Sequence, residues 1–174
     1  MMDGFEYYEY PQELNKYRRV ILLCGSRLPE AYQNLRQLIT GIKDIRVSSQ
    51  LAIFTALSSN LKLQKVEFIL TNLGFKYINK PISGLNICGL WKKDRILLIL
   101  GIDQFSYWAR WGEVGVANAG TATEQLVGLG IPCVSLPGKG PQFNLKFAMR
   151  QSRLLGGSVA VSKNSKDLAR RVEV

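Results

Sequence analysis

The sequence has no histidine and only three cysteines among its 174 residues. Without histidine the chain cannot form a Ser-His or Cys-His nucleophile pair, and it has no histidine general base. Cys24, Cys88 and Cys133 share no C-x-x-C spacing, so we expect neither a zinc site nor any other bound metal. Cys24 and Cys133 lie in apolar runs, where a thiol packs as a small core side chain.

Long hydrophobic runs are also absent. The longest, residues 96–102, has the length of a strand and falls far short of the about 20 residues that span a bilayer. Residues 1–11 are acidic, polar and aromatic, which is typical of neither a signal peptide nor a basic transit peptide. The mean hydropathy of +0.01 and the chain length are typical of one globular domain, and we expect a cytoplasmic protein.

Acidic residues are in the minority, and the charge is unevenly distributed. The net charge is +10, from 23 basic and 13 acidic residues. Residues 1–17 carry four acidic side chains against one lysine, a local charge of −3. Residues 143–174 carry seven basic side chains against two acidic ones, a local charge of +5. A basic end suits nucleic acid, an anionic membrane surface or phosphate ligands, and does not choose among them.

From residue 18 onward, short apolar runs alternate with amphipathic stretches. Apolar runs predict strands at residues 19–24, 51–57, 75–78, 95–101, 113–117, 132–136 and 158–161. Helical spacing predicts helices at residues 31–42, 63–73, 105–111, 121–129, 142–155 and 166–172. A stretch with Pro81, Gly84 and Gly89 separates the third strand from the fourth. This alternation predicts a Rossmann-like, three-layer α/β/α domain with a mostly parallel sheet.

Three glycine-bearing segments follow predicted strands and precede predicted helices. They are Gly25-Ser26-Arg27, Gly120-Thr121-Ala122-Thr123 and residues 137–141. In an open parallel sheet, ligands bind outside the carboxyl ends of the strands. Free N–H groups and the helix dipole at such turns suit phosphate, and a guanidinium can bind phosphate oxygens in a fork. Neither G-x-G-x-x-G nor G-x-x-x-x-G-K-[ST] is present, which argues against a dinucleotide site or a P-loop.

Structural explanations compete with these ligand roles. Turns in α/β folds use glycine in any case, and Arg27 has the alternative role of a solvated surface charge. Thr121 and Glu124 have the T-x-x-E spacing of a capping box, a role that is compatible with ligand contact.

Aromatic and basic residues form two further groups, whose functional alternatives stay open. The aromatic group favours a core or interface over base stacking; its members are Phe105, Tyr107, Trp91, Trp108 and Trp111. The basic group has helical spacing and consists of Lys146, Arg150 and Arg153. It favours a solvated helix face, with contact to an anionic lipid surface or a partner as the alternative.

The three glycine-bearing segments together resemble a known family. Residues 23–27, 119–125 and 137–143 are similar to the C-terminal domain of lipid-A-disaccharide synthase, above all to its cyanobacterial lipid-A-disaccharide synthase-related branch. The segments occur in the family's order, and the resemblance covers essentially the whole chain. It implies one half of a GT-B fold, with residues 18–174 as the donor-binding domain. Residues 1–17 would be the interdomain linker or N-terminal extension, and the acceptor-binding N-terminal domain would be missing.

The resemblance also implies roles for individual residues. Gly25, Ser26 and Arg27 would contact the diphosphate of a nucleotide-sugar. A second group would meet it from the opposite helix N-terminus: Gly120, Thr121 and Ala122, with Thr123 adding a hydroxyl. Gln142, with Asn144, would face the sugar or the diphosphate.

Ribose binding is the point at which the sequence departs from the family pattern. The family has a ribose-binding Glu seven residues before the proline that opens the next strand. Counting back from Pro132, that place holds Gln125, and the acid lies at Glu124, so either could contact the ribose. The family's catalytic base belongs to the N-terminal domain, so we expect no catalytic residue in this chain.

The function implied is transfer of a hexose from a UDP-sugar to a lipid-linked acceptor, without metal, on the cytoplasmic face of the inner membrane. A standalone nucleotide-binding or regulatory module without catalytic activity is the alternative.

The net charge of +10 also motivates a nucleic-acid binder, but the sequence lacks a stacking-aromatic motif. Sugar-nucleotide epimerases share the architecture, yet they rely on acidic and histidine residues that this chain cannot supply in full. An exposed cleft face would favour a homodimer.

Overall fold

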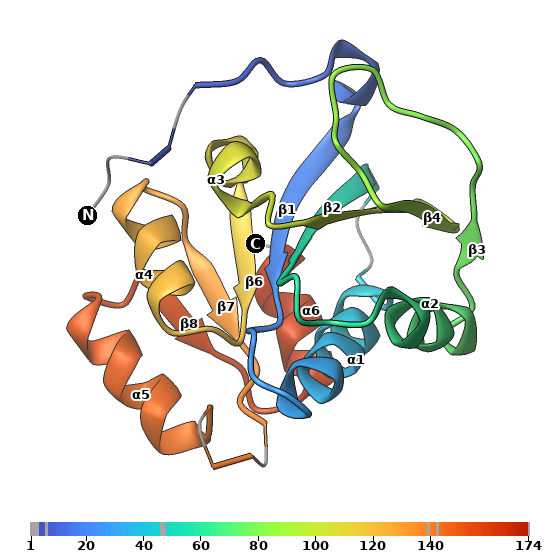
Figure 1. The fold of residues 1–174 in the computed structure, drawn as a ribbon. Helices are drawn as coiled ribbons and strands as arrows, with labels where there is room; N and C mark the ends of the chain where they lie inside the picture. Colours follow the sequence, from blue (N-terminus) through green and yellow to red (C-terminus); the bar gives the residue numbers. More distant parts are fainter. Residues whose placement is uncertain (1–3, 6, 46–47, 139, 142, 174) are drawn as a thin grey trace.

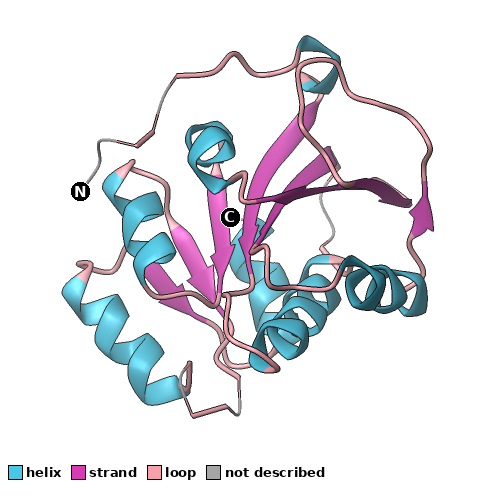
Figure 2. Cartoon of the chain, viewed as in Figure 1, coloured by secondary structure: helices cyan, strands magenta, loops and turns pink. Residues whose placement is uncertain are grey.

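The computed structural model describes residues 4–5, 7–45, 48–138, 140–141 and 143–173. These residues form a single eight-stranded sheet with the strand order β3-β4-β5-β2-β1-β6-β7-β8. Strand β4 runs antiparallel to β3 and β5, and all other neighbours pair in parallel. Helices cover both faces of the sheet (Figure 1, Figure 2). The predicted three-layer α/β/α domain with a mostly parallel sheet is confirmed.

The secondary-structure elements follow the alternation seen in the sequence. The strands are β1 Tyr17–Leu23, β2 Gln50–Leu57, β3 Lys76–Tyr77, β4 Gly89–Lys93, β5 Ile96–Ile102, β6 Val114–Ala117, β7 Cys133–Ser135 and β8 Val159–Val161. The helices are α1 Glu30–Ile42, α2 Leu63–Asn72, α3 Phe105–Trp108, α4 Thr121–Gly128, α5 Leu145–Leu154 and α6 Ser165–Glu173. Two 3-10 turns complete the order, η1 Gln12–Leu14 and η2 Ala109–Trp111.

The sheet separates two hydrophobic cores. Helices α1, α2 and α6 cover one face, where alternate residues of β1, β2 and β5 pack against Leu35, Leu38 and Ile39 of α1. Helices α3 and α4 cover the other face, and α5 packs beside β8 on that side. The central strands are therefore buried on both faces, which explains their continuous apolar sequences.

Strand β4 was not predicted from the sequence, because Pro81, Gly84 and Gly89 mark a loop. It pairs with β5 from Gly89 opposite Leu100 to Lys93 opposite Ile96, so a neighbouring strand supplies the hydrogen bonds that define it. Trp91 lies on β4 and packs in the core on the α1 side.

The aromatic residues do not form one cluster. Trp108 and Trp111 are buried on the opposite face of the sheet from Trp91, where both rings pack edge-on against Phe54. The core role expected for the tryptophans is confirmed. The idea of a single cluster is wrong, because Trp91 points from β4 to the α1 side of the sheet, whereas Trp108 and Trp111 lie on α3 and η2 on the other side.

The prediction that residues 1–17 lie outside the core is wrong at Leu14, which is buried among the residues of the α3 side. Trp111 donates from Nε1 to the carbonyl of Tyr8 (2.9 Å), and the ring of Phe5 packs edge-on against Phe105 (5.6 Å). The described part of this segment is therefore attached to α3 and η2.

The close packing of β5 against α3 depends on Gly101. A Cβ at this position would overlap the Trp108 ring and lie 2.7 Å from Cγ of Gln104. We expect Gly101→Ala to lower the free energy of unfolding by about 1–3 kcal/mol, although alanine suits a strand better than glycine. Urea denaturation of the variant and the unchanged chain measures this difference in the free energy of unfolding. Combining the change with Trp108→Leu, which makes room for the methyl group, should cost less than the sum of the two single changes; additivity would contradict this explanation.

Candidate functional site at the switch point

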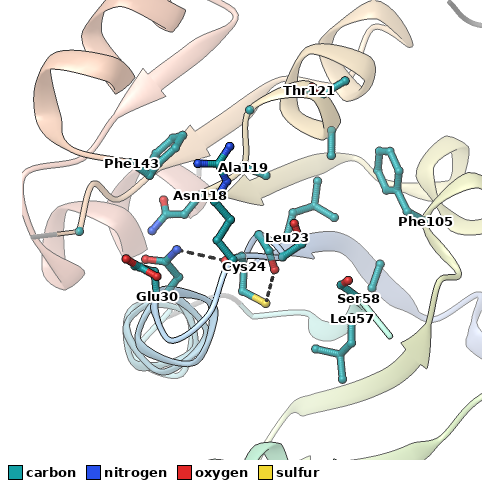
Figure 3. A pocket seen from close by; sticks show the side chains of 18 of the residues that line it. Leu23, Cys24, Glu30, Leu57, Ser58, Phe105, Asn118, Ala119, Thr121 and Phe143 are labelled. Carbon is teal, nitrogen blue, oxygen red and sulfur yellow. Dashed lines mark hydrogen bonds between the residues drawn. The ribbon is translucent and has the colours of Figure 1, made fainter. Parts of the chain in front are cut away.

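The site lies where neighbouring strands β1 and β6 reach their carboxyl ends. Leu23 at the end of β1 pairs with Ala117 at the end of β6. From β1 the chain crosses through α1 to β2 on one side, and from β6 it crosses through α4 to β7 on the other. The place where the two connections diverge is the topological switch point of the sheet, and it leaves a crevice at the strand ends. A pocket of about 640 Å³ occupies this position (Figure 3).

The pocket brings together most of the residues predicted from the sequence. The predicted residues that line it are Gly25, Ser26, Arg27, Gly120, Thr121, Ala122 and Gln125. Thr123, Glu124 and Asn144 do not line it, and Gln142 lies outside the described residues. The two segments are almost a hundred residues apart in sequence, yet they face one cavity.

The turn between β1 and α1 requires a glycine. Gly25 has a φ of 81°, and a Cβ there would lie 3.1 Å from the carbonyl oxygen of Asn118, so a side chain would be strained and crowded. Asn34 donates from Nδ2 to the carbonyl of Cys24 (3.1 Å) and Asn60 to that of Ser26 (2.6 Å), which fixes the turn from outside.

Arg27 at this turn is exposed, and it makes no side-chain hydrogen bond or ion pair with any other described residue. Its guanidinium is therefore available to a ligand.

The turn between β6 and α4 is held by buried amides. The side chain of Asn118 is buried and bonds both main-chain groups of Leu136, donating to the carbonyl (2.5 Å) and accepting from the N–H (3.0 Å). Gln151 of α5 donates to the carbonyl of Gly120 (3.1 Å). The N–H groups of Thr123 and Glu124 both bind the carbonyl of Gly120 (3.1 and 3.3 Å), whereas those of Thr121 and Ala122 have no partner among the described residues and remain available at the pocket.

Two predicted residues, Thr123 and Asn144, have structural roles instead of facing the pocket. Thr123 is fully buried, and its hydroxyl donates to the carbonyl of Ala119 (2.5 Å). The capping box is wrong, because Gly120 is the N-cap of α4 and Thr121 already belongs to the first helical turn. Asn144 caps α5 by accepting from the N–H of Phe147 (3.0 Å), so its oxygen is already used.

The structure separates the two candidates for ribose contact. Glu124 is exposed on the first turn of α4 and lies outside the pocket lining, whereas Gln125 lines it. Successive side chains on an α-helix point in directions about 100° apart, so Gln125 can face the pocket while Glu124 faces solvent.

The pocket also contains residues that sequence analysis missed. One side is formed by α1 and the loop before α5, with Glu30 and Phe143; Ser58 and Phe105 lie on the opposite side in Figure 3. The α1 residues carry little signal of their own, because the polar stripe of Glu30, Gln33 and Gln37 has the spacing of an ordinary solvent-facing side of an amphipathic helix. Ser58 and Phe105 carry no such signal, because the pairing of β2 with β5 brings them together.

The thiol at the base of the pocket is not a nucleophile. Burial raises the pKa of Cys24 to about 12, so the thiol stays protonated at neutral pH. The same cause raises the pKa of Cys133 to about 12.

Among the residues that the structure describes, no group of three or more acidic, cysteine or histidine side chains could hold a metal ion. In the same part of the chain, none of the helices has the length and apolar character to cross a membrane.

A mostly parallel sheet, helices on both faces and a crevice at the switch point define a GT-B-like domain of the Rossmann type. The same fold occurs in the crystal structure of a proposed UDP-N-acetylglucosamine 2-epimerase from Listeria monocytogenes, with a TM-score of 0.59 and 14% sequence identity. That match covers 95% of this chain but only 38% of the Listeria chain, so this chain spans well under half the length of that protein.

Two other solved structures are similar at a TM-score of 0.48. They are a UDP-N-acetylglucosamine 2-epimerase, at 13% identity, and S. aureus MnaA with UDP, at 15% identity. Each match covers 95% of this chain, against 37% and 47% of the other chains. No protein-family model and no curated protein matches the sequence. The Listeria match thus shows a GT-B-like fold, and none of the comparisons singles out the lipid-A-disaccharide synthase family.

The bridge from Asn118 to Leu136 should contribute strongly to stability. We expect Asn118→Ala to lower the free energy of unfolding by about 2–4 kcal/mol, because both main-chain groups of Leu136 lose a partner. Ser135→Ala, which removes one hydrogen bond to the carbonyl of Ala117 in the same strand pair, is the matched control and should cost about 1 kcal/mol. If Asn118→Ala and Ser135→Ala lower the free energy of unfolding equally in urea, the two hydrogen bonds of Asn118 contribute no more to stability than one.

Proposed function

We propose that the pocket binds the diphosphate of a UDP-sugar, and that the chain is the donor-binding half of a GT-B glycosyltransferase that moves a hexose to a lipid-linked acceptor. The observation that carries the proposal is the convergence of two strand-to-helix turns on one pocket at the switch point. The turn at residues 25–27 and the start of α4 both offer main-chain N–H groups without a partner among the described residues, and both suit an anion placed between them.

Of the three charged residues that line the pocket, Arg27, Glu30 and Asp103, the cation Arg27 supports a diphosphate in particular. Arg27 lies beside the first turn without a protein partner among the described residues, and a guanidinium can bind two phosphate oxygens at once. During sugar transfer, negative charge builds up on the leaving diphosphate. Arg27 and the N-terminus of α4 would stabilise that charge without a metal ion.

The size of the pocket and the fold support a sugar nucleotide. A volume of about 640 Å³ lies within the range of about 300–1,000 Å³ of small-molecule sites. The Listeria protein with this fold carries the description of an enzyme of UDP-N-acetylglucosamine. In this proposal Gln125 contacts the ribose, which its place in the pocket lining beside the second turn supports.

The resemblance to lipid-A-disaccharide synthase directs the proposal toward transfer rather than epimerisation. In that family the acceptor site and the catalytic base lie on a separate domain, and the chain has no histidine to serve as a base. Helix α5 supports a membrane-linked acceptor, because Lys146, Arg150 and Arg153 are exposed together with Leu145 and Leu154. Basic and apolar side chains on one exposed helix surface suit contact with an anionic lipid surface.

Calorimetric titration of the chain with UDP, UDP-N-acetylglucosamine, ADP and GDP, with and without Mg²⁺, tests the proposal. We expect uridine selectivity that does not require the metal. Arg27→Ala should weaken UDP binding by about tenfold or more, because a charged bidentate contact is lost. Arg36→Ala is the matched control, since Arg36 is an exposed cation of α1 outside the pocket lining, and it should leave the affinity unchanged.

Three results would count against the proposal. Equal affinities of the Arg27→Ala variant and the unchanged chain would remove Arg27 from the site. Equal binding of UDP, ADP and GDP would favour a general nucleotide-binding or regulatory module over a UDP-sugar donor domain. Absence of binding by any of the four nucleotides would contradict a donor site that works without the acceptor domain.

A further inference from the structure

One face of α1 forms a polar wall of the pocket, beside the turn that carries Arg27. Four of its residues line the cavity: Glu30, Gln33, Asn34 and Gln37. Their spacing of three, four and seven residues places them on one stripe of the helix. The wall contains one carboxylate and three amides and no cation, so its chemistry differs from that of the turn that carries Arg27.

The wall has unused hydrogen-bonding groups. The side-chain oxygen of Gln37 is buried and has no hydrogen-bond partner among the described residues. The side chains of Glu30 and Gln33 make no hydrogen bond to any residue in the described ranges either, whereas the Asn34 nitrogen is used by the Cys24 carbonyl. A buried acceptor without a partner is costly, so the wall is suited to a ligand that donates hydrogen bonds.

The loop before α5 lies against the wall. A Cβ at Gly138 would lie 3.2 Å from the Asn34 side-chain oxygen and 3.8 Å from that of Gln37, and a Cβ at Gly140 would lie 3.0 Å from Cγ of Glu30. Glycine at both positions lets the loop approach the wall without crowding its polar atoms. Both glycines line the pocket, so the loop and α1 enclose one end of it.

The chemistry of the wall selects among the parts of a sugar nucleotide. A carboxylate repels phosphate, which places the diphosphate at the turns and not against Glu30. Sugar hydroxyl groups are neutral, and they donate to carboxylate and amide oxygens while accepting from amide N–H groups. Glu30 and Phe143 lie on one side of the pocket and Phe105 on the other (Figure 3), so a ligand whose diphosphate lies between them has its two ends in different surroundings.

We infer that Glu30, Gln33 and Gln37 bind the hydroxyl groups of the transferred sugar, and that this wall distinguishes a UDP-sugar from UDP alone. The inference rests on the proposed function, because it assumes that the diphosphate occupies the two turns. It assigns the α1 end of the pocket to the sugar and the Phe105 end to the nucleoside.

Calorimetric titration with UDP and with UDP-N-acetylglucosamine tests the inference. Glu30→Ala should weaken binding of the UDP-sugar by about tenfold or more, because a charged hydrogen-bond acceptor is lost. The same change should leave the affinity for UDP unchanged or raise it, because it removes a negative charge near phosphate. Gln37→Met should weaken only the UDP-sugar, by severalfold. Glu67→Ala on α2, an acidic residue outside the pocket lining, is the matched control and should change neither affinity.

The possible outcomes separate the inference from the proposed function. Parallel losses for UDP and UDP-N-acetylglucosamine would mean that Glu30 supports the fold or the nucleotide, and would overturn the sugar subsite while leaving the UDP site in place. Unchanged binding of both ligands by the two variants would also overturn it. If the unaltered chain binds neither ligand, both the proposed function and the subsite fail. Glu30→Gln, which keeps the shape of the side chain, provides the same comparison should Glu30→Ala unfold.

Discussion

Strands β1 and β6 lie side by side near the middle of the sheet, and the chain leaves them in opposite directions. Because α1 and α4 diverge from neighbouring strands, neither helix can cover the space above the strand ends, and a crevice results from the topology itself. The rest of the site depends on this arrangement. The close approach of Gly25 to Asn118 and the two helix starts that face one pocket both follow from it.

Neutral amide side chains hold the main chain around this crevice. Asn34 binds the carbonyl of Cys24, Asn118 binds the main chain of Leu136, and Gln151 binds the carbonyl of Gly120. All three are buried. A buried amide can bond to the backbone without bringing a charge, although the side-chain oxygen of Gln151 has no partner among the described residues. A buried charge would need a charged partner and would alter the field at the pocket. The charged side chains of Arg27 and Glu30 are left to act on whatever the pocket holds.

Much of the fold could be predicted from the sequence, because hydrophobic periodicity reflects burial directly. Continuous apolar runs indicated the parallel strands, and helical spacing indicated α1, α2 and α4. Strand β4 was missed, since a short strand beside turn residues is defined by its pairing with β3 and β5 rather than by its own composition. The division of the tryptophans between two cores also depended on which strand and face each one occupies.

For the site, the sequence by itself determined the types of residue at the two turns and excluded histidine chemistry, because these depend on composition and on position relative to a strand end. The tertiary structure decided which of them share a pocket. It placed Gln125 rather than Glu124 at the cavity, turned Thr123 into the interior and brought the polar face of α1 to the same space. Which side chains face the pocket depends on the rotation of each helix about its axis and on the packing of segments that are distant in sequence. The pattern of residues along the chain specifies neither.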